Sequence, residues 1–444
     1  MKYISSRGKS LGLTELIAIA VGGMVGGGIF SILGISAEMI GFVTPVAIFL
    51  GGILALMAAY SYVKLGVYYK DEGASYAFVK RTFPGSHKAA AVLGWLVIFG
   101  YISTLSLYSY TFASYANSQF SIADNEWMRK LTAWSILLVF YLINIWSVKG
   151  MGKIEDLMVY TKLLILLIIS VLFITHGRES FGSFMEKFFH DVEQTRLLAI
   201  LIVASITFVS YEGFQLVINA VNEMTDPDRN IPRAIYGAIV LVITIYLVLA
   251  FGALFAIPLE DLIRGKEYAL ASGASQVIGK AGELMVIFGA LLATSSAISG
   301  TVFGSSRQMA AIAEDGYFPK ALAKRNRKNI PYTALTVMVL LAALLILIGG
   351  LRLILEFGSI TFILVSLIIA YTNYVIRDKT GSGTFATLAS IIGLTGGVIL
   401  ILYYELKHKP EQMAFIAAIY VILGTGAYLY ARRRERLDEQ KNSD

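Results

Sequence analysis

Gly22-Gly23-Met24-Val25-Gly26-Gly27-Gly28 places five glycines in seven positions, inside a long apolar stretch near the N-terminus. Each glycine in a helix interior costs about 0.8–1 kcal/mol relative to alanine, so this run predicts a helix that unwinds locally. The pairs Gly22/Gly26 and Gly23/Gly27 also fit a face of small residues that packs closely against another helix. We favour unwinding, because three consecutive glycines exceed what such a face requires.

The composition around this run is that of a membrane protein. Hydrophobic residues make up 57% of the 444 residues and charged residues 15%, whereas soluble domains average about 45–50% and about 25%. Apolar runs near or above the ~18 residues that cross a bilayer recur along the chain. Because separate spans in lipid satisfy their backbone only as helices, we expect an all-α integral membrane protein. There is no cysteine and the four histidines are scattered, so we expect no metal site and no cofactor.

Twelve transmembrane helices are predicted from the apolar runs. The eight prolines lie between these runs or near their ends, where proline does not break a helix. The predicted spans are Leu13–Ile40, Val43–Lys64, Ala89–Asn117, Leu131–Val148, Asp156–Thr175, Leu197–Val221, Ala234–Ile257, Gly282–Gly304, Tyr332–Gly349, Leu353–Ile376, Thr384–Tyr404 and Met413–Tyr430.

The distribution of positive charge predicts how these spans are oriented. An even number of spans puts both tails on one side. Of the 37 lysine and arginine residues, 25 fall in the tails or in loops on that side, and 11 fall in the opposite loops. Because positive charge concentrates on the cytoplasmic side, we expect both termini in the cytoplasm and the protein in the plasma membrane. The cluster Arg432-Arg433-Arg434 is then interpreted as a topology anchor, and no nucleic-acid partner is expected.

A second interruption is predicted in the sixth span, where Ser210-Tyr211-Glu212-Gly213 lies near the middle. Gly213 follows Gly27 by 186 positions, which is five spans later. Two interrupted helices at corresponding positions are typical of a five-plus-five inverted repeat, with the substrate site where the breaks meet. The predicted divisions are a tail (1–12), a first repeat of spans one to five (13–176), a second repeat of spans six to ten (195–376), spans eleven and twelve (383–431) and a tail (432–444).

Two charged side chains are predicted to lie deep in the membrane. Lys162 lies about two turns inside the fifth span, roughly 10 Å deep at 1.5 Å per residue. A lysine there either gains and loses a proton in a buried pocket or extends back to the interface. Glu212 lies in the middle of the sixth span, at a cost of about 2.5–3.5 kcal/mol on insertion scales. It is a proton site, a partner for a cationic substrate or a structural hydrogen-bonding group within the break.

Four segments carry a resemblance to a known family. They are Gly26-Gly27-Gly28-Ile29-Phe30, Asn222–Ile235, Ser305-Ser306-Arg307 with Ala313–Pro319, and Ile154–Leu166. The first three resemble, in order and position, the motifs of the amino acid–polyamine–organocation (APC) superfamily, whose transporters have the LeuT fold with discontinuous helices one and six. The fourth resembles the fifth span of a sodium-independent, proton-coupled member. The resemblance covers spans one to eight, while spans nine and ten fit by pattern.

The resemblance implies a site at the two breaks. In sodium-coupled relatives a cation lies between spans one, five and eight, and Lys162 falls where a proton-coupled relative has a lysine ammonium. It would then reach the carbonyl of Gly22 and a hydroxyl from Ser295 or Ser296. Exposed amides would bind a substrate carboxylate and exposed carbonyls its amine. The residues expected are Val25, Gly26, Gly27 and Gly28 for the carboxylate, Phe208, Val209 and Ser210 for the amine, Tyr101 and Phe208 for closing the pocket, and Lys162 and Glu212 for proton coupling.

These features predict a secondary active transporter and not an enzyme. We expect proton-coupled, sodium-independent amino acid symport by alternating access, with an amino acid, protons and the lipid bilayer as partners. A channel would need a continuous polar pore, and a membrane enzyme a cluster of catalytic groups at one face; neither pattern occurs. The alternative is an exchanger of amino acids or polyamines. Ile206 stands where the family's arginine–agmatine exchangers have a gating tryptophan, which argues against arginine exchange. The sequence leaves the particular substrate and the oligomeric state open.

Overall fold

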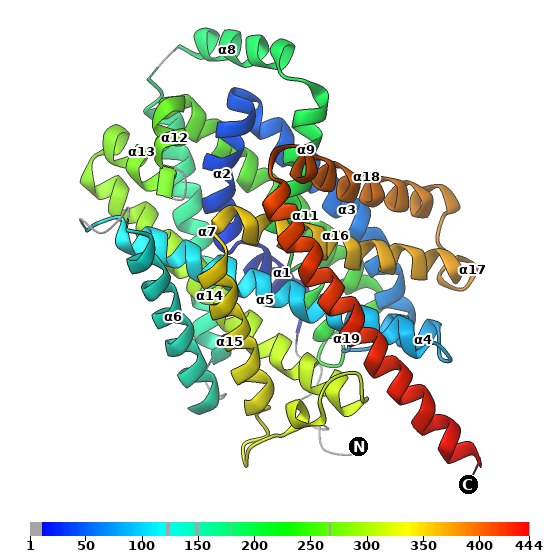
Figure 1. The fold of residues 1–444 in the computed structure, drawn as a ribbon. Helices are drawn as coiled ribbons and strands as arrows, with labels where there is room; N and C mark the ends of the chain where they lie inside the picture. Colours follow the sequence, from blue (N-terminus) through cyan, green and yellow to red (C-terminus); the bar gives the residue numbers. More distant parts are fainter. Residues whose placement is uncertain (1–10, 121–124, 147–150, 179, 266–267, 444) are drawn as a thin grey trace.

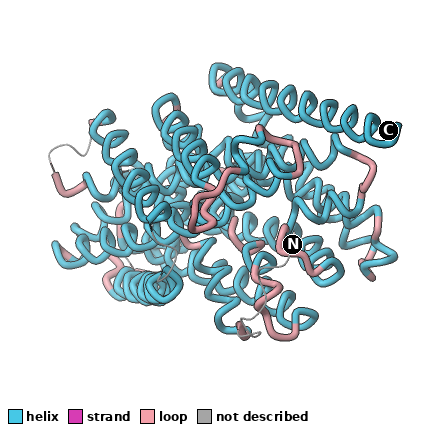
Figure 2. Tube along the Cα trace, turned by 90° about the horizontal axis from the view of Figure 1, so that it is seen from below, coloured by secondary structure: helices cyan, strands magenta, loops and turns pink. Residues whose placement is uncertain are grey.

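The computed structural model describes residues 11–120, 125–146, 151–178, 180–265 and 268–443. These residues form helices joined by loops (Figure 2), and the one β-bridge among them pairs Leu11 with Met224. The all-α prediction is therefore confirmed for the described chain. The helices are α1 (Leu13–Met24), α2 (Gly27–Ile40), η1 (Gly41–Val43), α3 (Thr44–Tyr69), α4 (Ala74–Thr82), α5 (His87–Asn117), α6 (Glu126–Trp146), α7 (Met151–Thr175), α8 (Phe181–Gln194), α9 (Leu197–Thr207), η2 (Phe208–Tyr211), α10 (Leu216–Asn219), α11 (Pro227–Ala256), α12 (Leu259–Gly265), α13 (Ala269–Ile278), α14 (Lys280–Glu314), η4 (Lys320–Ala323), α15 (Tyr332–Ile348), α16 (Leu351–Val375), α17 (Arg377–Thr380), α18 (Thr384–His408) and α19 (Pro410–Ser443), where η marks a 3₁₀ helix.

Ten stretches of the described chain are long and apolar enough to cross a membrane. One of them, Gly28–Tyr69, covers α3 and all but the first residue of α2, and these two helices belong to the second and first predicted spans. The apolar helices α1 and α15 are shorter, with 12 and 17 residues. Each predicted span therefore has a helical counterpart, while length and hydropathy alone support ten spans and the number twelve stays a prediction.

The last helix extends beyond its predicted span. The twelfth span was expected to end at Tyr430, but α19 continues to Ser443 through the predicted tail. Arg434 and Asp438 form an ion pair there at 3.4 Å, one helical turn apart. Hydropathy marks only the apolar part of a helix, and polar residues with good helix propensity and such pairs continue it. The predicted end of the fourth span, Val148, lies outside the described residues.

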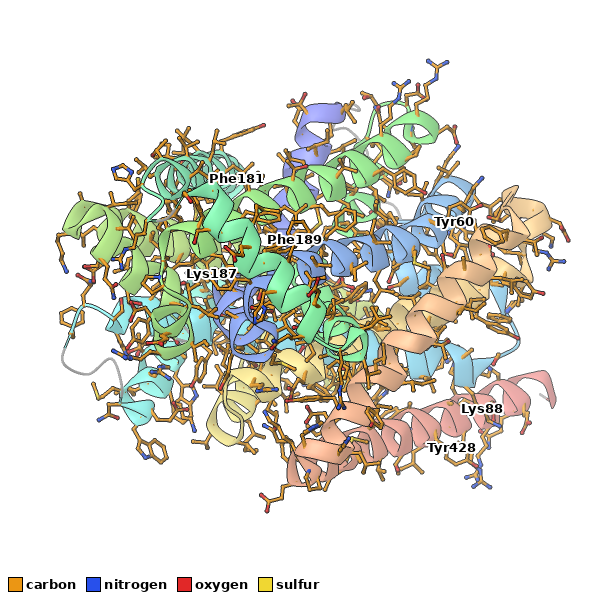
Figure 3. All side chains as sticks on the ribbon, turned by 90° about the horizontal axis from the view of Figure 1, so that it is seen from above. Tyr60, Lys88, Phe181, Lys187, Phe189 and Tyr428 are labelled. Atoms are coloured by element: carbon orange, nitrogen blue, oxygen red, sulfur yellow. The ribbon has the colours of Figure 1, made fainter. Side chains whose placement is uncertain are left out.

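The helix α5 is central to the bundle. It packs against α6, α14, α16 and α19, while α11 packs against α1, α3 and α7. In Figure 1, α8, α12 and α13 lie at one end of the bundle, and α19 runs to its C-terminus at the opposite end. The contact between α5 and α19 includes Lys88, whose ammonium lies 5.9 Å from the ring centroid of Tyr428 (Figure 3). The bundle is thus organised around a helix that also lines the first break.

Polar residues make α5 unusual for a central membrane helix. Ser106, Ser109 and Thr111 each donate their hydroxyl to the carbonyl four residues earlier, at 2.8 Å. These bonds satisfy the hydroxyls within the helix, so they can be buried without water. A Cβ placed on Gly27 would lie 2.9 Å from Thr111 Oγ1. The hydroxyl-rich side of α5 therefore lies directly against the glycine run.

The amphipathic helix α8 crosses one end of the bundle (Figure 3). Phe184 is buried against the ring of Phe255, with centroids 5.5 Å apart. Asp191 accepts a hydrogen bond from the amide of Phe42 at 3.0 Å, which ties α8 to the connection between α2 and α3. Phe181 on the other edge is 70% exposed. The helix is thus attached to the end of α2 while it keeps an apolar edge outside.

Candidate functional site

The first break lies between α1 and α2. Helical hydrogen bonding ends at Val25, whose amide donates to Val21 O at 2.8 Å, and Gly26 turns the chain before α2 begins. The interruption is shorter than the glycine run that predicted it, and the other glycines of the run stay helical. Both interpretations therefore apply, with unwinding at the centre and close packing on either side. The break exposes carbonyls at the end of α1 and amides at the start of α2.

The second break follows α9. The helix η2 leads into Glu212, whose backbone is extended (φ −68°, ψ 139°), and then into Gly213 with φ +127°, a conformation that favours glycine. Helix α10 resumes for only four residues. The amide of Glu212 donates to Val209 O at 3.2 Å, and that of Leu216 to Gly213 O at 3.1 Å. This break therefore satisfies much of its own backbone.

The two breaks are in direct contact. A Cβ on Gly213 would lie 2.4 Å from the carbonyl carbon of Gly23. Tyr246 of α11 joins the breaks, because its hydroxyl lies 3.0 Å from the carbonyl oxygens of both Met24 and Ser210. Only glycine permits such an approach of backbone to backbone. The two segments predicted to be interrupted thus form one place in the fold.

Lys162 of α7 extends into the first break and is fully buried. Its ammonium donates hydrogen bonds to Gly22 O at 2.9 Å, to Val25 O at 2.6 Å and to Ser296 Oγ of α14 at 3.0 Å. The side chain does not extend to the membrane interface, which was the alternative that the sequence left open. Gly22 and Ser296 are two of the partners expected, the carbonyl of Val25 is an additional one, and Ser295 lies half-buried next to Ser296.

The oxygens around Lys162 suit a positive charge. The last carbonyls of a helix lack partners within the helix and carry its partial negative charge. Lys162 satisfies two such carbonyls at the end of α1 and one hydroxyl of α14. An ammonium has three N–H groups and no acceptor, so its charged form matches three acceptors. A proton on this side chain therefore ties α1, α7 and α14 together.

Glu212 is buried in the second break, with 3% of its surface exposed. Its Oε2 accepts a hydrogen bond from Gln215 Nε2 at 2.6 Å, and Gln215 Oε1 accepts one from the Gly213 amide at 3.0 Å. The carboxyl group therefore belongs to a short hydrogen-bonded chain within the break. This arrangement is the structural hydrogen bond considered from the sequence.

Three tyrosines surround Glu212. Tyr62 on α3 and Tyr101 and Tyr108 on α5 lie within electrostatic range of its carboxyl group. The ring of Tyr101 packs edge-on against Phe362 of α16, with centroids 5.7 Å apart. The structure thus brings Tyr101, a predicted pocket residue, to the same place as the acid.

Some backbone groups expected to bind substrate already have partners. The amides of Val25 and Gly26 donate to carbonyls of α1 at 2.8 and 2.9 Å, and the carbonyl of Ser210 accepts the hydroxyl described above. The amides of Gly27 and Gly28 are different, because they begin α2 and have no partner within that helix. Of the four residues expected to bind the carboxylate, only Gly27 and Gly28, in the first turn of α2, keep amides without a partner in the helix.

The side chain of Ser210 adds a group that the backbone-based prediction did not include. Its hydroxyl is buried and has no hydrogen-bond partner among the described residues. A Cβ on Gly28 would lie 2.7 Å from this oxygen, so the hydroxyl lies beside the first turn of α2. Phe208, two residues earlier in η2, is fully buried. A buried hydroxyl without a partner, next to helix N-terminal amides, is available for a ligand.

Two residues that complete the breaks were missed from the sequence. Tyr246 lies within the seventh predicted span, where one tyrosine among 25 carries no signal. Gln215 follows Glu212 by three residues, but the chain between them is not helical, so the spacing rule for helices does not select this pair. Tertiary contacts decide the first case and the local turn of the break decides the second.

An apolar groove of about 470 Å³ lies away from the breaks, between α3 and α18. None of its lining residues belongs to the predicted site, and their side chains offer no polar partner for a charged solute. We therefore do not assign transport to this groove. Its lining residues are Met57, Phe385, Leu388, Ala389, Ile392 and Gly393.

Helical spans with two touching breaks, a lysine bound by carbonyls and a buried acid define the class of membrane transporters for small charged solutes. The sequence model of the amino acid permease family matches residues 11–426. The chain belongs to this family, which lies within the APC superfamily. The resemblance seen in the sequence is therefore confirmed at the level of the family, and the protein is a transporter of amino acids, not an enzyme.

Relatives from several organisms are similar over most of the chain. An uncharacterized protein of Methanocaldococcus jannaschii is 30% identical over 403 residues, which is 90% of both chains. The inner membrane transport protein YbaT of Escherichia coli is 30% identical over 340 residues, 75% of this chain and 76% of the relative. The large neutral amino acids transporter small subunit 2 of Mus musculus is 27% identical over 349 residues, 77% of this chain and 65% of the relative.

Proposed function

We propose that the protein carries out proton-coupled, sodium-independent amino acid symport by alternating access. The observation that carries the proposal is the buried ammonium of Lys162 among Gly22 O, Val25 O and Ser296 Oγ. A fixed ammonium in such a cradle removes the need for a bound sodium ion, and its proton becomes the coupling ion. The resemblance of the fifth span to that of the proton-coupled transporter ApcT supports the same reading.

The architecture proposed for this activity has twelve spans, with both termini in the cytoplasm of a plasma-membrane protein. The interruptions in spans one and six support a five-plus-five inverted repeat of the LeuT type. The bias of positive charge supports the orientation. The name of the mouse relative supports a large neutral amino acid as the substrate class.

Substrate binding is proposed where the breaks touch. The amides of Gly27 and Gly28 and the hydroxyl of Ser210 bind the carboxylate, since a helix N-terminus favours an anion. The carboxyl group of Glu212 faces the amine or a proton. Tyr101 covers this acid from α5. All of these groups lie at the contact between the two breaks, so a substrate bound there bridges them.

Proton coupling follows from the number of N–H groups on Lys162. The ammonium donates to three oxygens at once, whereas the neutral amine has two N–H groups and a lone pair. Loss of the proton therefore leaves two N–H groups for the three oxygens, and it removes the positive charge that the carbonyls at the end of α1 attract. This weaker attraction loosens α7 from α1 and α14 and favours the other facing state of the transporter.

Uptake of radiolabelled amino acids into proteoliposomes tests the proposal. An inward proton gradient should drive accumulation, replacing sodium by choline should not change it, and collapsing the gradient with an ionophore should abolish it. Uptake that depends on internal amino acid and not on the gradient would support an exchanger instead. Accumulation that requires sodium would show that Lys162 does not replace a metal ion.

A further inference from the structure

A second group of buried charges lies where the start of α16 meets the end of α18. Arg352 and Glu356 belong to α16, and Glu405 lies in the last turn of α18. Both glutamates are completely buried. Arg352 Nε donates to Glu356 Oε1 at 2.9 Å, and its Nη2 lies 2.5 Å from Tyr404 Oη. The cluster is separate in sequence and in helices from the breaks, and the transport mechanism above does not use it.

Three of the four carboxyl oxygens in this cluster lack hydrogen-bond donors. Glu356 Oε2 and both oxygens of Glu405 are buried without a hydrogen-bond partner among the described residues. Arg352 therefore satisfies one carboxyl oxygen of the four. Burying a carboxylate without a partner is among the most unfavourable arrangements in a protein, so a missing donor is expected here.

Other charged groups face the pair but do not supply this donor. Lys409, just after α18, and Glu38 of α2 lie within electrostatic range of the cluster. The oxygens of Glu405 nonetheless accept no hydrogen bond from Lys409. His408 is exposed and stacks on the ring of Tyr404, with centroids 4.6 Å apart. Among the described residues, no three acidic or histidine side chains gather in a way that could hold a metal ion.

We propose that Glu356 and Glu405 form a proton-binding site in which the two carboxyl groups share one proton. They lie within hydrogen-bonding reach of each other, so a proton on one is donated to the other. One proton then satisfies an oxygen on each side chain and leaves a single negative charge beside Arg352. Without it, two like charges face each other out of water, which two carboxylates sharing a site avoid.

The shared proton connects three helices. It joins α16 to α18, and Arg352 Nη2 extends the connection to Met39 Sδ near the end of α2, at 3.4 Å. Since α2 is the half of the first span that begins at the break, proton occupancy at this cluster biases the position of that half. The predicted topology places the cluster on the side away from the cytoplasm. This site does not rest on the coupling role proposed for Lys162.

Thermal unfolding of the purified full-length protein tests the site. A group that is stabilised in its protonated form loses that contribution as pH rises through its titration. Without substrate, the wild-type Tm should therefore fall as pH is raised. In Glu405→Gln the amide donates permanently to Glu356, so the fall should become smaller, and the part that remains comes from other groups such as Lys162 and Glu212. A fall as steep as that of the wild type would contradict the proposal. Glu411→Gln, an exposed change close by, should keep the wild-type pH dependence.

Infrared difference spectroscopy provides a readout that does not depend on stability. In a Glu212→Gln background, a protonated-carboxyl C=O band should persist near neutral pH, vanish at high pH and be absent after Glu405→Gln. If the Glu405 variant does not fold, Glu356→Gln, whose amide can donate to Glu405, replaces it. If the band persists in both variants, or if it is absent from the Glu212→Gln parent, the proposal is wrong. A rise in Tm on adding sodium or calcium at constant pH, lost in Glu405→Gln, would show a metal-cation site instead.

Discussion

The two breaks satisfy their exposed backbone in different ways. In the first break, side chains from other helices reach the carbonyls, because Lys162 bonds Gly22 and Val25 and Tyr246 bonds Met24. In the second break, the segment mostly bonds itself through Glu212 and the residues around it. Hydrogen bonds between different helices can form and break when the transporter changes its facing state. Hydrogen bonds within one segment move with that segment. We infer that the first break switches and that the second is its fixed reference.

Replacing Lys162 with alanine should have the largest effect on the first break. The change leaves Gly22 O, Val25 O and Ser296 Oγ buried without their donor, at about 1–3 kcal/mol for each unsatisfied group. We expect a folded, less stable protein that still binds substrate and whose gradient-driven uptake falls to that of empty liposomes. The measurements are uptake, binding and Tm.

The matched control for this change is Lys407→Ala, which removes an exposed lysine of α18 and should leave uptake unchanged. Gradient-driven uptake by Lys162→Ala at the wild-type rate would remove the lysine from the mechanism. Equal loss in both variants would point to a nonspecific effect of charge.

Gly213→Ala should distort the second break and lower the stability of the protein. A left-handed backbone costs a non-glycine residue about 1–3 kcal/mol, and here the new Cβ also lies 2.4 Å from the Gly23 carbonyl carbon. We expect Tm and the amount of folded protein to drop, with substrate binding lost in proportion. Gly396→Ala in α18, where the Cβ meets open space, should keep or slightly raise Tm. Tolerance of Gly213→Ala would show that the breaks do not touch.

Tyr246→Phe tests whether a side chain couples the two regions. The change removes one hydroxyl that reaches Met24 O and Ser210 O, at a cost of about 1–3 kcal/mol for the carbonyl left unsatisfied. We expect a lower maximal uptake rate with a smaller change in KM. Tyr211→Phe removes a similar buried bond, to Ile48 O, without joining the breaks, and should lower Tm while sparing the rate. Equal effects on the rate would refute a coupling role.

The difference between the regions also explains what the sequence could predict. Local signals located both breaks, since five glycines in seven residues and an acid within a span are visible without coordinates. The same signals located Lys162, whose depth in the fifth span follows from counting residues. These features depend on short stretches of chain, where propensity and burial cost decide the outcome.

Features that depend on packing between distant helices could not be predicted in this way. Tyr246 bonds residues 222 and 36 positions away, and no spacing rule selects it among the tyrosines. The carbonyl of Val25 joined the lysine site because the break is shorter than the glycine run. Glu356 was missed although it lies within the tenth predicted span, so its partner Glu405, one residue beyond the eleventh, was not sought.

Glu212→Gln is the mildest change and sharpens the comparison further. The glutamine can still accept the hydrogen bond from Gln215, so the break should persist. The free energy of unfolding should change by less than about 1 kcal/mol, and Tm should change little. If Glu212 binds a proton or a cationic group, the pH profile of uptake or the preference among substrates should change while Tm does not. Gln215→Leu serves as the control, because it removes the local bond and keeps the acid. If both variants alter Tm alike and neither alters the profiles, Glu212 is a structural member of the second break.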